Sequence, residues 1–165
     1  MKMTSKGFSI VEVLICCAVL SVTGHIAMLS VAGQLNNLKI KRATAQAHAI
    51  LTTARDTAYG MKKDIWLHAD LSSASGFFAI HHDNLLRNPQ TIFTQAINPQ
   101  QITEVSITTT FSSLRFSGVT GRPYGNGNIS IGLNGETLVK VIYHDITGRI
   151  RICSSSAILF GYPAC

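Results

Sequence analysis

Arg149 and Arg151, in the segment DITGRIRIC (residues 145–153), are the side chains whose type and spacing best suit the binding of a ligand. A Thr-Gly turn signal separates two runs of alternating apolar and polar residues. On the second run, Arg149, Arg151 and Cys153 share one face of the expected strand, at intervals of about 6.6 Å. Because arginine can contact a phosphate with two N–H groups, this spacing suits successive phosphates of an extended nucleic-acid strand.

The turn also predicts how the two strands of this hairpin pair. With a loop of two or four residues, the register pairs His144 with Arg149, Ile142 with Arg151 and Lys140 with Cys153. Lys140 would then extend the basic strip of the hairpin. An alternative remains open, because alternating arginine and isoleucine is also typical of a half-exposed strand that binds nothing.

The histidines offer weaker candidates for chemistry. His81, His82 and Asp83 are adjacent, as are His144 and Asp145. Neighbouring residues on a strand point to opposite faces, so His81 and His82 are poorly placed to share one metal ion. The sequence contains no G-x-S-x-G, H-E-x-x-H or phosphate-loop motif. We therefore expect no enzyme activity, no metal site and no cofactor.

The four cysteines fall into two pairs. Cys16 and Cys17 lie in an apolar run, where cysteine usually behaves as a small hydrophobic residue. Cys153 and Cys165 lie in the more polar part of the chain and enclose a 13-residue loop. In an oxidising compartment we expect a disulfide between them, worth about 3 kcal/mol, whereas two free thiols are the alternative.

Two kinds of segment must position these residues. Residues 8–33 are apolar apart from Glu12, His25 and small hydroxyl residues, and about 20 apolar residues suffice for a membrane-spanning helix. Residues 34–59 lack Pro and Gly, and their apolar residues recur three or four apart, which predicts an amphipathic helix. We expect one continuous helix over residues 8–59, stopped by Gly60. The expected packed face contains Leu35, Leu38, Ala43, Ala47, Ile50, Leu51, Ala54 and Ala58.

Beyond Gly60, short runs rich in Ile, Val, Thr and Phe predict antiparallel strands. The expected strands are residues 64–69, 76–82, 104–111, 114–117, 128–132, 138–145 and 149–153. Residues 83–101 are expected to form a loop with one short helical turn. The predicted fold class is α+β, with a long N-terminal helix packed on an antiparallel β-sheet domain.

The N-terminus resembles a type IV prepilin leader. A short basic segment ends in Lys6-Gly7, an aromatic residue, Phe8, follows, and Glu12 stands at the fifth position after Gly7. The resemblance implies that a prepilin peptidase cleaves after Gly7 and methylates the new N-terminus at Phe8. It also explains a carboxylate in an apolar helix, because Glu12 would pair with the N-terminal amine of a neighbouring subunit. Many pilins have a proline in this helix; here none precedes Pro89, so no proline kink is expected.

The C-terminal GRIRIC and the expected strands resemble the FimT/GspH branch of minor pilins and pseudopilins. In the FimT branch a Gly-Arg-x-Arg element is associated with DNA binding during natural transformation, and Gly148, Arg149 and Arg151 match that element. Arg115 and Arg122 flank glycine-rich loops and would widen a basic patch. A minor pilin without DNA binding, or a secretion pseudopilin, remains an alternative.

The resemblance implies three regions: a leader (residues 1–7), a transmembrane and pilus-core helix segment (8–33) and a periplasmic globular domain (34–165). The last region has 12 Lys and Arg against 7 Asp and Glu, a net charge of +5, which is compatible with an acidic partner such as DNA. The expected location is the bacterial inner membrane, crossed once, with the C-terminal domain in the periplasm. The expected partners are other pilin subunits, the prepilin peptidase, the membrane and DNA.

The leader generates the first testable prediction. Mass spectrometry of the protein recovered from membranes should find a mature N-terminus at Phe8 that carries one methyl group. An intact Met1, or cleavage beyond residue 30, would contradict the assignment of residues 1–7 as a prepilin leader.

Overall fold

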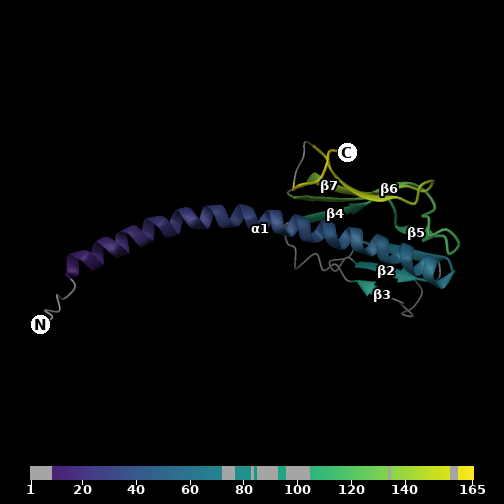
Figure 1. Ribbon diagram of the computed structural model, residues 1–165, viewed down its shortest axis with the longest axis horizontal. Coiled ribbons are helices and arrows are strands. Elements are labelled where there is room, and N and C mark those ends of the chain that lie inside the picture. Colours follow the sequence, from purple (N-terminus) through teal and green to yellow (C-terminus); the bar gives the residue numbers. More distant parts are fainter. Residues whose placement is uncertain are drawn as a thin grey trace, which may run out of the picture. The chain divides into compact units, whose positions relative to one another are not determined.

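The structure is a computed structural model that describes residues 9–71, 77–82, 84, 93–95, 105–133, 135–156 and 160–165. It divides into two compact units, Met1–Leu38 and Lys39–Cys165. A single helix, α1 (Ile10–Met61), contributes its first part to one unit and its second part to the other (Figure 1). The helix has no interruption, as the absence of proline predicts. Gly60 lies within it rather than ending it, and the chain leaves the helix at Lys62, which has a φ of 54°.

In the first unit, α1 exposes a series of large apolar side chains. Their exposed fractions are near or above one half; they are Ile10, Val11, Val13, Leu14, Ile15, Val19, Leu20 and Val22. Within the described residues, no helix is both long and apolar enough to cross a membrane.

In the second unit, one face of α1 is completely buried. The buried residues are Ile40, Ala43, Thr44, Ala47, Ile50, Leu51, Ala54 and Ala58. The prediction that Leu35 and Leu38 belong to this face was wrong, since they are 51% and 61% exposed. Both belong to the first unit, before the point where sheet residues begin to cover the helix.

Within the described ranges, eight strands form two four-stranded antiparallel sheets. The first sheet has the order β3-β2-β1-β5, with bounds β1 Ile65–Asp70, β2 Phe77–His81, β3 Phe93–Gln95 and β5 Ser113–Phe116. The second has the order β4-β6-β7-β8, with bounds β4 Val105–Thr109, β6 Gly127–Leu133, β7 Glu136–Tyr143 and β8 Ile150–Ser154. The architecture is thus the expected α+β class, and all seven expected strands are present.

The expectation for residues 83–101 needs one correction. Phe93–Gln95 form β3, which pairs with β2 through Phe78 and Gln95, Ala79 and Thr94, and Ile80 and Phe93. Pairing with β2 stabilises a strand of three residues that alternation alone could not indicate. Of residues 83–101 the structure describes only 84 and 93–95, so the expected helical turn lies outside the described residues.

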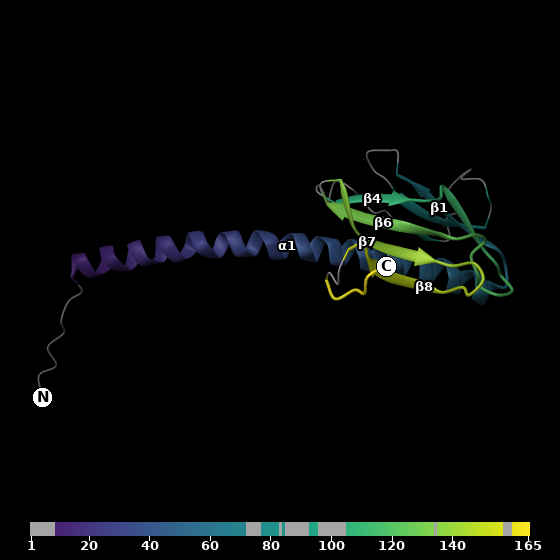
Figure 2. The same ribbon diagram turned by 90° about the horizontal axis from the view of Figure 1, so that it is seen from above.

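A single hydrophobic core joins the buried face of α1 to both sheets. The first sheet contributes Ile65, Leu67, Phe78, Ile80, Leu114 and Phe116, and the second contributes Val105, Ile129, Ile131, Val139, Val141 and Tyr143. Figures 1 and 2 show this part of α1 alongside both sheets. The four alanines of the helix face leave space for the large rings and branched side chains of the strands.

A polar corner fixes the exit of the chain from α1. Asp64, just before β1, accepts a hydrogen bond of 2.8 Å from the backbone N–H of Gly118 and one of 3.0 Å from Nε of Arg115 on β5. The Gly118 N–H and the Arg115 guanidinium both lower the pKa of Asp64, the former more strongly. Gly118 is required here, because a Cβ would lie 2.4 Å from the backbone nitrogen of Lys63.

This corner predicts a pH dependence of stability. The pKa of Asp64 is lower in the folded chain than its ordinary value of 3.8, so its contribution is complete above that value and is lost as the pH falls through the folded pKa. Chemical unfolding should therefore find Asp64→Asn less stable than wild type at pH 7. The difference should shrink at about pH 2.5, below the ordinary pKa of 3.8, because the unfolded wild-type chain then gains a proton at Asp64 that the folded chain binds less readily. A difference that stays constant between the two pH values would contradict this role.

Candidate nucleic-acid interface

The hairpin β7–β8 has the register expected from the sequence. Lys140 pairs with Cys153 and Ile142 with Arg151. At the end of the ladder the backbone N–H of His144 donates to the carbonyl of Arg149 at 3.1 Å. The loop between the strands therefore contains four residues, 145–148.

Gly148 sets the geometry of that loop. Its φ is +64°, a left-handed conformation that glycine adopts without strain, and its N–H donates to the carbonyl of His144 at 2.9 Å. The backbone N–H of Arg149 donates to the hydroxyl oxygen of Thr147 at 3.3 Å. The Gly148 of the Gly-Arg-x-Arg element thus acts through the backbone, because it orients the start of β8.

The two faces of the hairpin differ in burial. Val139, Val141 and Tyr143 point into the core, where Ile150 and Ile152 pack partly buried beside them. On the outer face, Arg149 and Arg151 are exposed, as expected. A one-residue shift of β8 would exchange these faces and direct both arginines into the core, so burial of the isoleucines fixes the orientation of the arginines.

Cys153 shares the outer face with the arginines but is 1% exposed. A disulfide joins it to Cys165, the pair expected from the sequence, with a Cα–Cα distance of 4.9 Å. The C-terminal residues lie beside the end of β8, where the N–H of Ser154 donates to the carbonyl of Pro163 at 2.7 Å and the N–H of Cys165 donates to the carbonyl of Ser154 at 2.9 Å. This segment covers one end of the strip and leaves the arginine end open.

A depression of about 250 Å³ lies over the open end of the strip. It is lined by Ile142, His144, Thr147, Arg149 and Arg151. Lys140 lies on the same strand face, next to the disulfide, but outside this depression. Lys140 is therefore a peripheral member of the expected strip. His144 lies beside Arg149, as the register predicted, and Thr147 is a neighbour of the arginines that the sequence pattern did not single out.

The arginines of the globular unit differ in whether they form an ion pair. Arg115 is bound to Asp64 and its guanidinium lies 4.4 Å from the ring centroid of Tyr124, so it is part of the fold and does not widen the basic patch. The hydrogen bond with Asp64 raises the pKa of Arg115, and burial acts in the opposite direction but more weakly. In contrast, Arg122, Arg149 and Arg151 are exposed and have no ion-pair partner within the part of the chain that the structure describes.

The second candidate site is the start of α1. Gly7 and Phe8 lie outside the described residues. The carbonyl of Ser9 accepts hydrogen bonds from the N–H groups of Glu12 at 3.0 Å and Val13 at 3.3 Å, which are the first backbone hydrogen bonds of α1. Glu12 is exposed in the first helical turn, where a carboxylate interacts favourably with the helix dipole.

The histidine candidates do not assemble into a site. His81 is buried and His82 is exposed, in agreement with opposite faces of a strand, and Asp83 lies outside the described residues. The ring of His81 meets that of His68 edge to face, with centroids 5.4 Å apart. Among the described side chains, no group of three or more potential metal ligands occurs.

The fold is similar to that of a solved minor pilin. Two crystal structures of the type IV minor pilin FimU from Pseudomonas aeruginosa align with 68% of this chain, with TM-scores of 0.58 and 0.56. The alignments cover 87% and 90% of the FimU chains at 16% sequence identity. No protein-family model and no curated protein matches the sequence. The chain thus has a type IV pilin-like fold, in agreement with the family resemblance of its sequence.

Proposed function

We propose that this chain is a minor subunit of a type IV pilus that binds DNA for uptake in natural transformation. Arg149 and Arg151 are the principal DNA contacts, and Lys140 adds a peripheral one. The observation that carries the proposal is a pair of exposed arginines that have no ion-pair partner among the described residues and lie on one face of a strand whose other face packs on the core.

The charge and geometry of the strip favour phosphate contact over base recognition. Arginines at alternate positions present planar donor groups in one direction, and a phosphate accepts two such N–H bonds at once. Two or three such contacts correspond to weak, salt-sensitive binding without sequence preference, with a dissociation constant of roughly 10⁻⁴ to 10⁻⁶ M. Weak contacts repeated along a polymer suit a protein that must later release the DNA.

Assembly into a pilus is supported by the first part of α1. Large apolar side chains such as Ile10, Leu14 and Leu20 are 64–81% exposed in the isolated chain, which is costly in water unless a partner covers them. We propose that residues 8–33 cross the inner membrane once before assembly, with the C-terminal domain in the periplasm. In the pilus they pack against the same segment of other subunits.

Glu12 has two roles in this proposal. Its carboxylate interacts with the helix dipole at the start of α1, and it pairs with the amine of Phe8 on a neighbouring subunit. Glu12→Gln removes the negative charge from both interactions, but the interaction with the dipole is much the weaker of the two, so a large loss of assembly reports on the pair. Ser9→Ala changes the residue before α1 and leaves the carboxylate in place, so it is the control.

Accordingly, Glu12→Gln should lower incorporation into sheared pili by about a hundredfold, since it leaves a buried charge without its partner. Ser9→Ala should assemble nearly as well as wild type. Immunoblots of the pilus and membrane fractions measure both variants. Incorporation of Glu12→Gln at the wild-type level would show that Glu12 does not set the subunit register.

DNA binding is tested with the full chain in detergent and a labelled duplex at two salt concentrations. Arg149→Gln/Arg151→Gln should lower the affinity and reduce the slope of log K against log salt by about two, because each arginine displaces about one counterion. The matched control is Lys41→Gln/Arg42→Gln, which removes two exposed charges from α1 outside the hairpin. The control should retain most of the affinity.

A double variant that binds duplex as well as wild type would overturn the DNA-binding proposal. The hairpin would then be an ordinary solvated strand, and the protein a structural minor pilin or a secretion pseudopilin.

A further inference from the structure

A second depression, of about 400 Å³, lies between α1 and two glycine turns. It is lined by Arg55, Asp56, Tyr59, Thr120, Gly121, Arg122, Thr147 and Gly148. It shares Thr147 with the depression over Arg149 and Arg151, so the two hollows adjoin at the β7–β8 turn.

The aliphatic parts of Arg55 and Arg122 lie beside the two glycines of this pocket. A Cβ on Gly121, which has a φ of +68°, would lie 3.4 Å from Cγ of Arg55. A Cβ on Gly148 would lie 3.2 Å from Cγ of Arg122. The aliphatic part of each arginine thus lies beside one of these glycines, and it is the positive φ of both positions, +68° and +64°, that favours glycine there.

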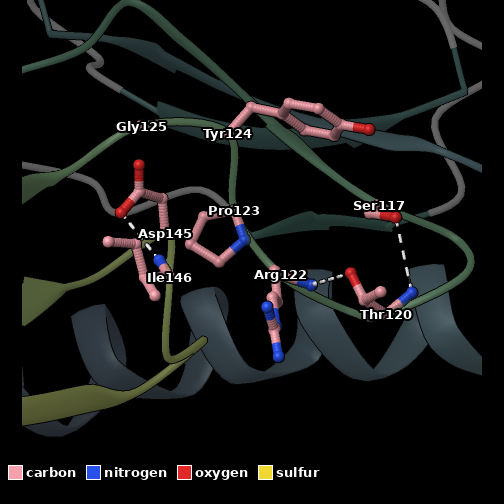
Figure 3. A pocket seen from close by; sticks show the side chains of 8 residues that line it. All are labelled: Ser117, Thr120, Arg122, Pro123, Tyr124, Gly125, Asp145 and Ile146. Atoms are coloured by element: carbon pink, nitrogen blue, oxygen red, sulfur yellow. Dashed lines mark hydrogen bonds between the residues drawn. The ribbon is translucent and has the colours of Figure 1, made fainter.

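The two guanidinium groups differ in their ion pairing. Nε of Arg55 donates to Oδ1 of Asp56 at 2.9 Å. Arg122 has no ion-pair partner among the described residues, and Figure 3 shows its guanidinium pointing toward the ribbon of α1 and away from Asp145. The pocket thus contains two arginines and one carboxylate, and Arg122 supplies its net positive charge.

Two hydroxyl groups add donors of the right kind. The hydroxyl oxygen of Thr120 accepts the backbone N–H of Arg122, and that of Thr147 accepts the backbone N–H of Arg149, each at 3.3 Å. Since each oxygen already accepts a hydrogen bond, its own O–H remains to donate to a ligand. Guanidinium and hydroxyl donors around one hollow are suited to a tetrahedral oxyanion.

We infer that this pocket binds a phosphate of the nucleic-acid backbone, with Arg122 as the principal contact. The inference rests on the proposed function, because the DNA strand that contacts Arg151 and Arg149 continues past Thr147 into the pocket. Asp56 weakens the site by occupying Arg55, so the wild-type pocket holds a phosphate loosely. Removal of the Asp56 charge converts the pocket from one available arginine to two.

The test uses the full chain in detergent with a labelled DNA duplex at two salt concentrations. Arg122→Gln should weaken binding about tenfold at low salt and reduce the salt slope by about one, whereas Asp56→Asn should strengthen binding about fivefold. Arg42→Gln removes one exposed charge outside both depressions and is the matched control. A gain of affinity in Asp56→Asn is informative, because a misfolded variant would not bind more tightly.

Inorganic pyrophosphate provides a probe that does not depend on the strip. In NMR spectra of the labelled full chain, pyrophosphate should shift the amide signals of Thr120, Arg122 and Gly148, and Arg122→Gln should abolish these shifts. If neither variant changes DNA affinity and pyrophosphate shifts none of these signals, the pocket is not a phosphate site.

The two proposals fail in different ways. If Arg149→Gln/Arg151→Gln loses binding while Arg122→Gln and Asp56→Asn match wild type, the strip binds DNA and the pocket inference is overturned. If Arg122→Gln loses binding and the strip variant does not, the pocket stands and the strip assignment is overturned. Pyrophosphate shifts that persist in Arg122→Gln would also exclude Arg122 as the contact.

Discussion

The buried face of α1 is the constraint on which the rest of the globular unit depends. The two sheets share no strand, and among the described residues they meet through one core to which the helix contributes Ile40, Ile50, Leu51 and four alanines. The chain changes sheets between β3 and β4, between β4 and β5 and again between β5 and β6. Small helix residues make this possible, because larger ones would overfill a core that already holds Phe78, Phe116 and Tyr143.

The geometry of the candidate interface depends on that core. The core buries Val139, Val141 and Tyr143, and this burial fixes which face of β7 is turned outward. The four-residue turn and the left-handed Gly148 then fix the register of β8 and bring the arginines to the outer face. The turn also carries Thr147 and Gly148 to the second hollow, so one short loop links both candidate phosphate contacts.

The sequence was most informative where a local pattern determines the structure. Alternation and a turn glycine sufficed for the hairpin register, and helical spacing identified most of the inner face of α1 but missed the buried Ile40 and Thr44. Three features depend on distant contacts. β3 forms because β2 pairs with it, Leu35 and Leu38 are exposed because the core begins only at Ile40, and Arg115 is sequestered by Asp64, which is 51 positions away. Arg115 and Arg122 look equivalent in sequence, and only tertiary structure separates them.

β8 is an edge strand of its sheet, and this position has a consequence for aggregation. In this register Arg149, Arg151 and Cys153 direct their backbone groups toward β7, so Ile150 and Ile152 direct theirs outward. The disulfide-linked C-terminus occupies the next outward position, at Ser154. The unpaired edge of β8 is therefore only a few residues long and is flanked by two arginines. Such an edge is too short and too highly charged to pair with a strand from another copy. This edge of the second sheet is thus protected against pairing with the same edge of another copy.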